Sequence, residues 1–138
     1  MSVETKELLN KLVAEDDINT FFKEYAGEFF SDNLKDFLNG LVAQKKLKIS
    51  DIVRASGQGD YVYKVFNGDR KPSRGILIGI AIGMNLSVNE TQFLLRIAKQ
   101  ATLDPRDKRD SIIIFSIKSG YDIIKTNALL EEMNEAGV

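Results

Sequence analysis

Apolar side chains recur at intervals of three or four residues along most of the chain. Within the first 45 residues they form three groups with the spacing of one helix face, at residues 8–13, 18–29 and 34–42. No segment alternates apolar and polar residues between hairpin turn signals, and both prolines lie near segment boundaries. The pattern therefore predicts an all-α protein.

Two shorter helices are expected in the next part of the chain. The hydroxyl of Ser50 can cap a helix N-terminus, and Gly57 is suited to the left-handed conformation that ends a helix. Asp60 then opens a second short helix, which Asn67 and Gly68 close. Two such helices joined by a glycine-containing turn have the helix-turn-helix pattern.

The second of these helices has one apolar and one polar face. Val62, Val65 and Phe66 are spaced to share the buried face. The opposite face is polar and aromatic and is formed by Asp60, Tyr61, Tyr63, Lys64 and Asn67. In a DNA-binding helix-turn-helix the second helix enters the major groove, where its side chains reach base edges. For Asp60, the alternatives to accepting from a cytosine amino group are to cap its own helix or to pair with Lys64.

Charge is strongly segregated along the chain, although the net charge is only −1. Residues 1–33 carry three lysines and eight acidic residues, a net charge of −5, whereas residues 34–75 carry nine cationic and four acidic residues, a net charge of +5. A local excess of positive charge is typical of a surface that binds a polyanion, although a solvated helix face has the same composition. Four residues directly after the second short helix are candidates for phosphate contacts, namely Arg70, Lys71, Ser73 and Arg74.

Several strings in this region resemble a known family. KISDIVRASG is followed by YVYKVFNG, by DRKPS, by an apolar helix and by NLSVNETQFLLRIA, and together they are similar to the helix-turn-helix module of phage repressor and Cro-type proteins, the XRE-like bacterial transcription regulators. The matched positions are Gly57, Gly68, Pro72, Ser73 and Ala81. The resemblance covers residues 34–98 and implies a repressor-like five-helix core that binds double-stranded DNA in the major groove and regulates transcription. The expected DNA-binding residues are Gln58, Asp60, Tyr61, Tyr63, Lys64, Asn67, Arg70, Lys71, Ser73 and Arg74.

The rest of the chain is expected to complete one compact domain, with an acidic helical extension at residues 1–33 and a helical hairpin at residues 99–138. Asp104 is expected to cap a helix that starts at Pro105, and Gly120 to end it. The second helix of the hairpin is expected to continue one apolar face through Ile123, Ile124, Ala128, Leu130 and Met133.

The hairpin also suggests how the protein associates. The segment SIIIFSI is apolar on nearly all sides, so either the preceding helices or a second copy of the chain has to cover it. Repressors of this family generally dimerise, because two half-sites multiply affinity. We therefore expect a homodimer with its interface in residues 104–138 and with the N-terminal helices as a further candidate. The alternative function is a protein–protein interaction module, antitoxin-like or a regulatory adaptor, on a helix-turn-helix scaffold with little DNA binding.

Composition argues against other classes of protein. The chain has no cysteine and no histidine, which removes the usual nucleophile, general base and metal ligands, so we expect no enzyme and no cofactor. Asp107 and Asp110 are assigned to helix caps and solvated faces. The longest apolar stretch, GILIGIAIGM, has half of the roughly 20 residues that a membrane helix needs and is a candidate core helix. We expect a cytoplasmic protein, because the sequence has no cysteine and no cationic leader followed by an apolar run. Its glycines, Gly75, Gly79 and Gly83, predict an inner helix that a neighbour crosses closely.

Overall fold

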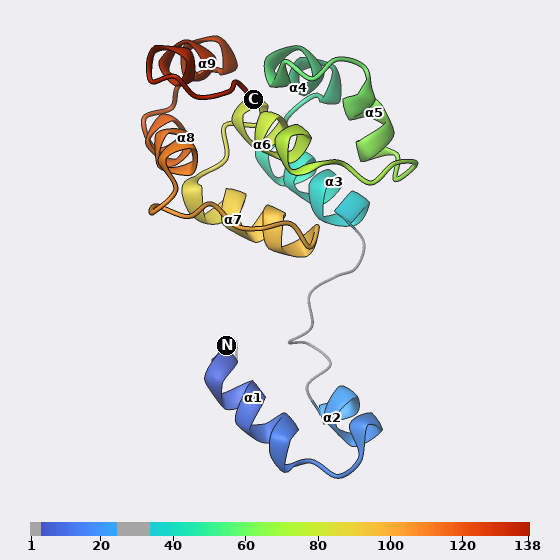
Figure 1. The fold of residues 1–138 in the computed structure, drawn as a ribbon. Helices are drawn as coiled ribbons and strands as arrows, with labels where there is room; N and C mark the ends of the chain where they lie inside the picture. The colour runs from blue at the N-terminus through green and yellow to red at the C-terminus, as the bar shows by residue number, and fades with distance from the viewer. Residues whose placement is uncertain (1–3, 25–33) are drawn as a thin grey trace. The chain divides into compact units, whose positions relative to one another are not determined.

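The computed structural model of the chain describes residues 4–24 and 34–138 (Figure 1). All regular elements in this described part are helices, which confirms the all-α prediction. Residue contacts divide the chain into two compact units, Met1–Ser31 and Asp32–Val138, instead of the single domain that the sequence predicts. None of the described helices combines the length and the hydrophobicity that crossing a membrane requires.

The first unit contains α1 (Thr5–Ala14) and α2 (Ile18–Glu24). The two helices coincide with the first two apolar groups of the sequence, although the expected continuation of the second group to residue 29 lies outside the described residues. Helix α1 buries none of its side chains, and Leu9 and Val13 are 58% and 78% exposed. This helix therefore presents an uncovered apolar stripe within its own unit.

The second unit is organised around one central helix, α6 (Arg74–Gly83), which contacts α4, α7 and α9. The other helices of the unit are α3 (Leu34–Lys45), α4 (Ile49–Ser56), α5 (Tyr61–Phe66), α7 (Val88–Ile97), α8 (Lys108–Lys118) and α9 (Ile123–Glu132). Four side chains of α6 are completely buried, which explains why its segment is the most continuously apolar in the chain; they are Leu77, Ile78, Ile80 and Ala81. The hydrophobic core of the unit forms around them.

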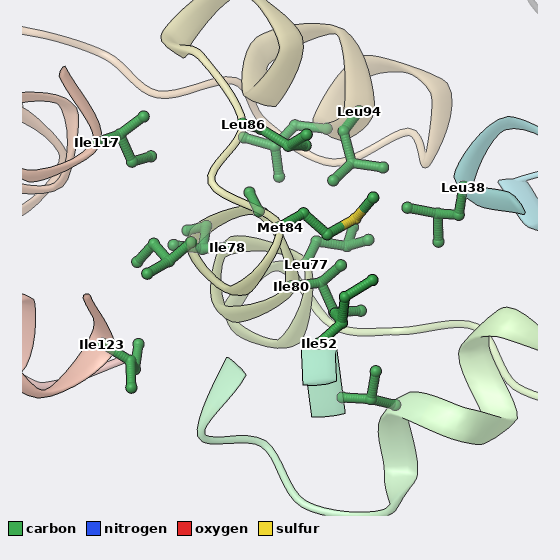
Figure 2. Packing of buried hydrophobic residues seen from close by; sticks show 14 of the residues in the cluster. Leu38, Ile52, Leu77, Ile78, Ile80, Met84, Leu86, Leu94, Ile117 and Ile123 are labelled. Carbon is green, nitrogen blue, oxygen red and sulfur yellow. The ribbon is translucent and has the colours of Figure 1, made fainter. Parts of the chain in front are cut away.

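The C-terminal hairpin belongs to this same core (Figure 2). Ile78 points toward the side on which Ile117 of α8 and Ile123 of α9 lie, whereas Leu38 of α3 lies on the opposite side of α6. Of the two ways to cover the apolar segment of α8, the structure shows packing against the preceding helices. Phe115 is nevertheless 48% exposed, so part of α8 stays uncovered in the single chain.

Glycines allow α4 to cross α6 closely. A Cβ atom on Gly79 would lie 2.9 Å from the carbonyl oxygen of Ser56, and one on Gly83 would lie 2.9 Å from the Ser56 nitrogen. Real Cβ atoms do not approach backbone atoms this closely, so both positions require glycine. The predicted close crossing is confirmed at these two positions. It is wrong at Gly75, where a Cβ atom would meet nothing within 4 Å.

Helix ends agree with the sequence where glycine sets them and differ where a polar cap was expected. Gly57 and Gly120 have positive φ values of 69° and 72° directly after α4 and α8, as predicted. Helix α4 starts at Ile49, with Lys48 in the N-cap position, so the prediction that Ser50 caps it is wrong. The cap lies two residues earlier, at Lys48, which has the extended backbone of a cap residue.

The start of α8 also differs from the prediction. The sequence places the cap at Asp104, but α8 starts at Lys108, and Asp107 is its N-cap. The carboxylate of Asp107 accepts a hydrogen bond from the backbone nitrogen of Asp110 at 2.8 Å. Asp104 accepts instead from the nitrogen of Arg106, at 2.8 Å, and so forms a turn before the helix.

Helix α9 does not present a single apolar face. Ile123 and Leu130 are buried in the core, but Ile124 is 77% exposed, and Ala128 and Met133 are exposed as well. The prediction is wrong because Ile123 and Ile124 are adjacent on the helix and point about 100° apart. Only one of the two can face α6.

Candidate functional site

The junction between α4 and α5 is a tight turn built on two glycines and a buried serine. Gly57 and Gly59 both have positive φ values. The fully buried hydroxyl of Ser56 donates to the carbonyl oxygen of Val53 at 2.9 Å and accepts from the backbone nitrogen of Gln58 at 3.3 Å. The buried hydroxyl of Ser56 therefore has both of its partners within this part of the chain, and α5 follows α4 after only a few residues.

Helix α5 has the two faces that the sequence predicts. Val62, Val65 and Phe66 are at most 2% exposed. Asn39 of α3 donates from its side-chain nitrogen to the carbonyl oxygen of Phe66 at 2.9 Å, which fixes the end of α5 against α3. The exposed residues on and next to α5 are Asp60, Tyr63, Lys64 and Asn67.

Asp60 shows neither of the alternative roles considered for it. It occupies the N-cap position of α5, but its side chain makes no capping hydrogen bond. Its carboxylate also forms no ion pair with Lys64 or with any other residue in the described part of the chain. Both groups therefore face solvent with their charges uncompensated by a neighbour.

Three further candidate residues are used to hold this region in place. The side chain of Gln58 packs over Gly79 of α6, where an added Cβ atom would lie 2.6 Å from its Cγ atom. The half-buried Tyr61 donates from its hydroxyl to the carbonyl oxygen of Lys71 at 3.3 Å. Ser73 caps α6 by accepting from the nitrogen of Ile76 at 3.4 Å.

Arg74, predicted to hold a phosphate, lies in a network within the protein. Its Nη1 and Nη2 atoms donate to the two carboxylate oxygens of Asp110 at 3.0 and 2.7 Å. Its Nε and Nη2 atoms donate to the carbonyl oxygens of Ala101 and Thr102 at 2.8 and 3.1 Å. The structure therefore does not leave this guanidinium free for the phosphate contact. Asp110 is buried and paired, so its assignment to a cap or solvated face is wrong.

The surroundings of this pair favour its charged form. Burial alone raises the pKa of the Asp110 carboxyl, but hydrogen bonds from Arg74 and from the Asp104 nitrogen, with the charges of Arg74 and Arg109, bring that pKa below its usual range. The hydrogen bond to Asp110 raises the pKa of Arg74. The pair is therefore ionised at neutral pH.

Other cations of the basic segment differ in whether they have partners. Lys45 pairs with Glu90 at 3.0 Å, and Arg54 pairs with Asp51. Lys64, Arg70 and Lys71 form no ion pair within the described residues, and all three are exposed. These three positive charges on and next to α5 are therefore available to a ligand.

Lys71 lines two adjoining hollows in the surface, and Arg70 lines one of them. One has a volume of about 370 Å³ and also contains Lys35, from the start of α3, and Asp69. The second has a volume of about 460 Å³ and contains Lys71 together with Lys99, from the end of α7. Sequence reasoning missed Lys35 and Lys99 as site residues. Lys35 belongs to the basic segment, so the charge pattern could have indicated it. Lys99 lies outside that segment, and the charge pattern gives no sign of it.

The described part of the chain offers no group of three acidic side chains placed to hold a metal ion. Comparisons of the sequence with protein-family models and with curated proteins, and of the structure with solved structures, returned no significant match. The resemblance of residues 34–98 to phage repressor-type proteins therefore stays a hypothesis based on the quoted strings.

Proposed function

We propose that the protein binds double-stranded DNA sequence-specifically and regulates transcription, with α4 and α5 as a helix-turn-helix inside a five-helix core of α3 to α7. The observation that carries the proposal is the exposed face of α5, which leads directly to two cations without ion-pair partners among the described residues, Arg70 and Lys71. A polar helix face followed by available cations fits base contact combined with phosphate contact.

The groups on this face match base edges in different ways. The Lys64 ammonium can donate to guanine O6 and N7, and the Asn67 amide can pair with adenine N6 and N7. The uncapped Asp60 carboxylate can accept from a cytosine amino group, which suits a group without a partner in its own helix. Arg70 and Lys71 then hold phosphates. The remaining candidates hold the surrounding loops and helices in place through contacts within the protein; they are Gln58, Tyr61, Ser73 and Arg74.

The proposal includes a homodimer, with its interface on the C-terminal hairpin. Phe115 and Ile124 are large apolar side chains that the single chain leaves exposed on α8 and α9. A second copy would cover them and place two α5 helices on successive half-sites. Light scattering at tens of micromolar protein is expected to give twice the mass of one chain, and Ile124→Lys is expected to lower it. A monomeric parent would contradict this part of the proposal.

Selection from random-sequence duplexes tests the function directly. The full chain is incubated with the pool at two salt concentrations, and the retained DNA is sequenced. We expect a short palindromic motif and an affinity that falls as the salt concentration rises. If no motif is enriched and no salt-dependent binding is seen, the proposal is wrong.

Lys64→Ala tests the role of α5 once a motif is known. If Lys64 reads a base, the variant is expected to lose about 1 to 3 kcal/mol of binding free energy and to accept other bases at one position. Lys6→Ala, an exposed lysine of α1, is the control for loss of one positive charge. Equal losses in the two variants, with unchanged base preference, would argue against base contact by α5.

A protein-interaction module is the second candidate function. It is favoured by α1, which carries exposed apolar residues in the part of the chain with a net charge of −5. Such a stripe fits a groove on a partner protein with positive charges at its rim. An antitoxin-like or adaptor protein would bind its partner through this stripe. If the DNA selection fails, the next step is to search for that protein partner.

A further inference from the structure

We infer that the two hollows around Lys71 form a second phosphate-contact region, in which Lys35 and Lys99 hold the DNA backbone beside the bases that α5 contacts. The inference rests on the proposed function and adds residues to it that the sequence did not indicate. Three parts of the fold would then contribute to the DNA-binding surface. They are α5 with the loop that follows it, the start of α3 and the end of α7.

The two hollows form one continuous surface. They share Leu34, Lys71 and Pro72, and the first of them reaches Gly68 at the end of α5. Figure 1 shows the start of α3, the loop between α5 and α6 and the end of α7 on the same side of the unit. A ligand that follows α5 along this loop therefore meets the hollows next.

Lys35 is held in position by its surroundings. Its aliphatic stem packs on Gly68, where an added Cβ atom would lie 3.1 Å from the Lys35 Cδ atom. Asn39 donates to the carbonyl oxygen of Lys35 at 2.8 Å and to that of Phe66 at 2.9 Å. These bonds tie the start of α3 to the end of α5, so the ammonium of Lys35 moves with the proposed recognition helix.

The end of α7 is fixed in a similar way. The backbone nitrogen of Lys99 donates to the carbonyl oxygen of Arg96 at 3.0 Å, and that of Gln100 donates to Leu95 at 2.9 Å. These bonds close the last turn of the helix and hold the backbone of Lys99 at the edge of its hollow. Its exposed side chain is left to reach an anion.

The charge of the hollows calls for an anionic occupant. Four cations line them, Lys35, Arg70, Lys71 and Lys99, with Asp69 as the acidic residue in their lining. None of the four cations forms an ion pair with a residue in the described ranges. Apolar groups such as Leu34 and Pro72 lie between the charges, and low-dielectric walls strengthen the field in a cleft.

A polymer fits this arrangement better than a single small anion. One phosphate would occupy one hollow, whereas a nucleic acid backbone places successive phosphates along both and continues to α5. Continuity with the proposed DNA surface therefore favours DNA as the occupant. An acidic protein segment is the competing occupant, and the experiment separates the two.

The test uses the full chain with Lys35→Gln and Lys99→Gln combined. Binding to the selected duplex and to a scrambled duplex is measured over a series of salt concentrations. Each phosphate contact contributes roughly 0.9 to the slope of log affinity against log salt, so the double variant is expected to lower the slope by about 2. We expect weaker binding to both duplexes, with the preferred motif unchanged.

The control is Lys6→Gln combined with Lys11→Gln, which removes the same charge from exposed positions of α1. Thermal unfolding of both double variants verifies that they fold. The inference is wrong, while the proposed function stands, if the parent binds DNA and the variant with Lys35→Gln and Lys99→Gln keeps the parent's slope of log affinity against log salt. It is also wrong if the slope falls by the same amount in the control. If the parent shows no salt-dependent DNA binding, both are wrong, and an acidic partner becomes the occupant to test.

Discussion

Arg70 and Arg74 lie four residues apart in the same basic segment, yet the structure gives them opposite surroundings. Arg74 donates to Asp110 and to the carbonyl oxygens of Ala101 and Thr102, whereas Arg70 is exposed and has no ion-pair partner in the described part of the chain. The two residues contribute equally to the local charge. The difference is the position of Asp110, which lies 36 residues after Arg74 in the chain and binds its guanidinium, whereas Arg70 stays available.

The same contrast extends to two regions of the second unit. The Arg74 junction, which comprises Arg74, residues 101–104 and Asp110, joins the start of α6 to α8 through hydrogen bonds around the buried Asp110. The open face, which comprises Asp60, Tyr63, Lys64, Asn67, Arg70 and Lys71, carries its polar groups toward solvent. The first region should therefore respond to mutation through stability, and the second through binding.

Removal of the Asp110 carboxylate should have the largest effect on stability. Asp110→Ala leaves the partly buried guanidinium of Arg74 without its anion, and we expect a loss of about 3 kcal/mol in the free energy of unfolding. The measurement is urea denaturation followed by circular dichroism. Asp69→Ala, at an exposed acid in the loop that leads to the open face, is the matched control and should change stability by at most about 0.5 kcal/mol. Similar losses in both variants would remove the distinction between the regions.

Arg74→Lys separates the charge of the junction from its geometry. Lysine keeps the positive charge but cannot donate in parallel to both Asp110 oxygens and to two carbonyl groups, so we expect a loss of about 1 to 2 kcal/mol. Arg70→Lys makes the same exchange at an exposed position and should leave stability unchanged. Full stability of Arg74→Lys would mean that charge alone holds the junction.

The junction should also give stability a dependence on pH. Because the folded protein lowers the pKa of Asp110, the carboxylate contributes its full stabilisation above the ordinary carboxyl pKa of roughly 3.9, and this is lost as the pH falls through the folded value. The difference in unfolding free energy between the parent and Asp110→Asn should be constant near neutral pH and should shrink in acid. A difference that stays constant in acid would contradict an ionised, paired Asp110.

Local features of the sequence predict much of this fold. Helical periodicity gives the buried face of α5, and Gly57 and Gly120 end their helices where expected, because these features depend on residues within one or two turns. The exposure of Ile124 could not be predicted in the same way. Two adjacent isoleucines are equally apolar, and only the packing of α9 on α6 decides which one is buried.

The candidate site shows the same limit. Periodicity places Lys64 and Asn67 on the exposed side of α5 correctly. It cannot show that Arg74 is engaged, because its partner lies in DPRDKRD, a string with three aspartates of which only Asp110 is buried. It also cannot show that Lys99 and Lys71 line the same hollow, since that depends on how distant parts of the chain pack.

Thr126 gives the smallest expected effect and tests the comparison of polar groups with and without partners in the core. It is buried, as Asp110 is, but among the described residues it has no partner, as Arg70 has none. Its hydroxyl oxygen has no hydrogen bond in the structure and is shielded from solvent. A buried polar group without a partner costs stability, so Thr126→Val should raise the free energy of unfolding by about 1 kcal/mol in urea denaturation.

Thr91→Val is the matched control for Thr126→Val. Thr91 is equally buried, but its hydroxyl donates to the carbonyl oxygen of Ser87 at 2.8 Å, so the same substitution should lower stability by about 1 kcal/mol. If the two substitutions change the free energy of unfolding in opposite directions, the hydrogen-bond partner, and not burial, determines what a polar group contributes to stability in this core. A loss of stability at Thr126 would show that its hydroxyl has a partner, and the contrast drawn from Arg70 and Arg74 would then not extend to the core.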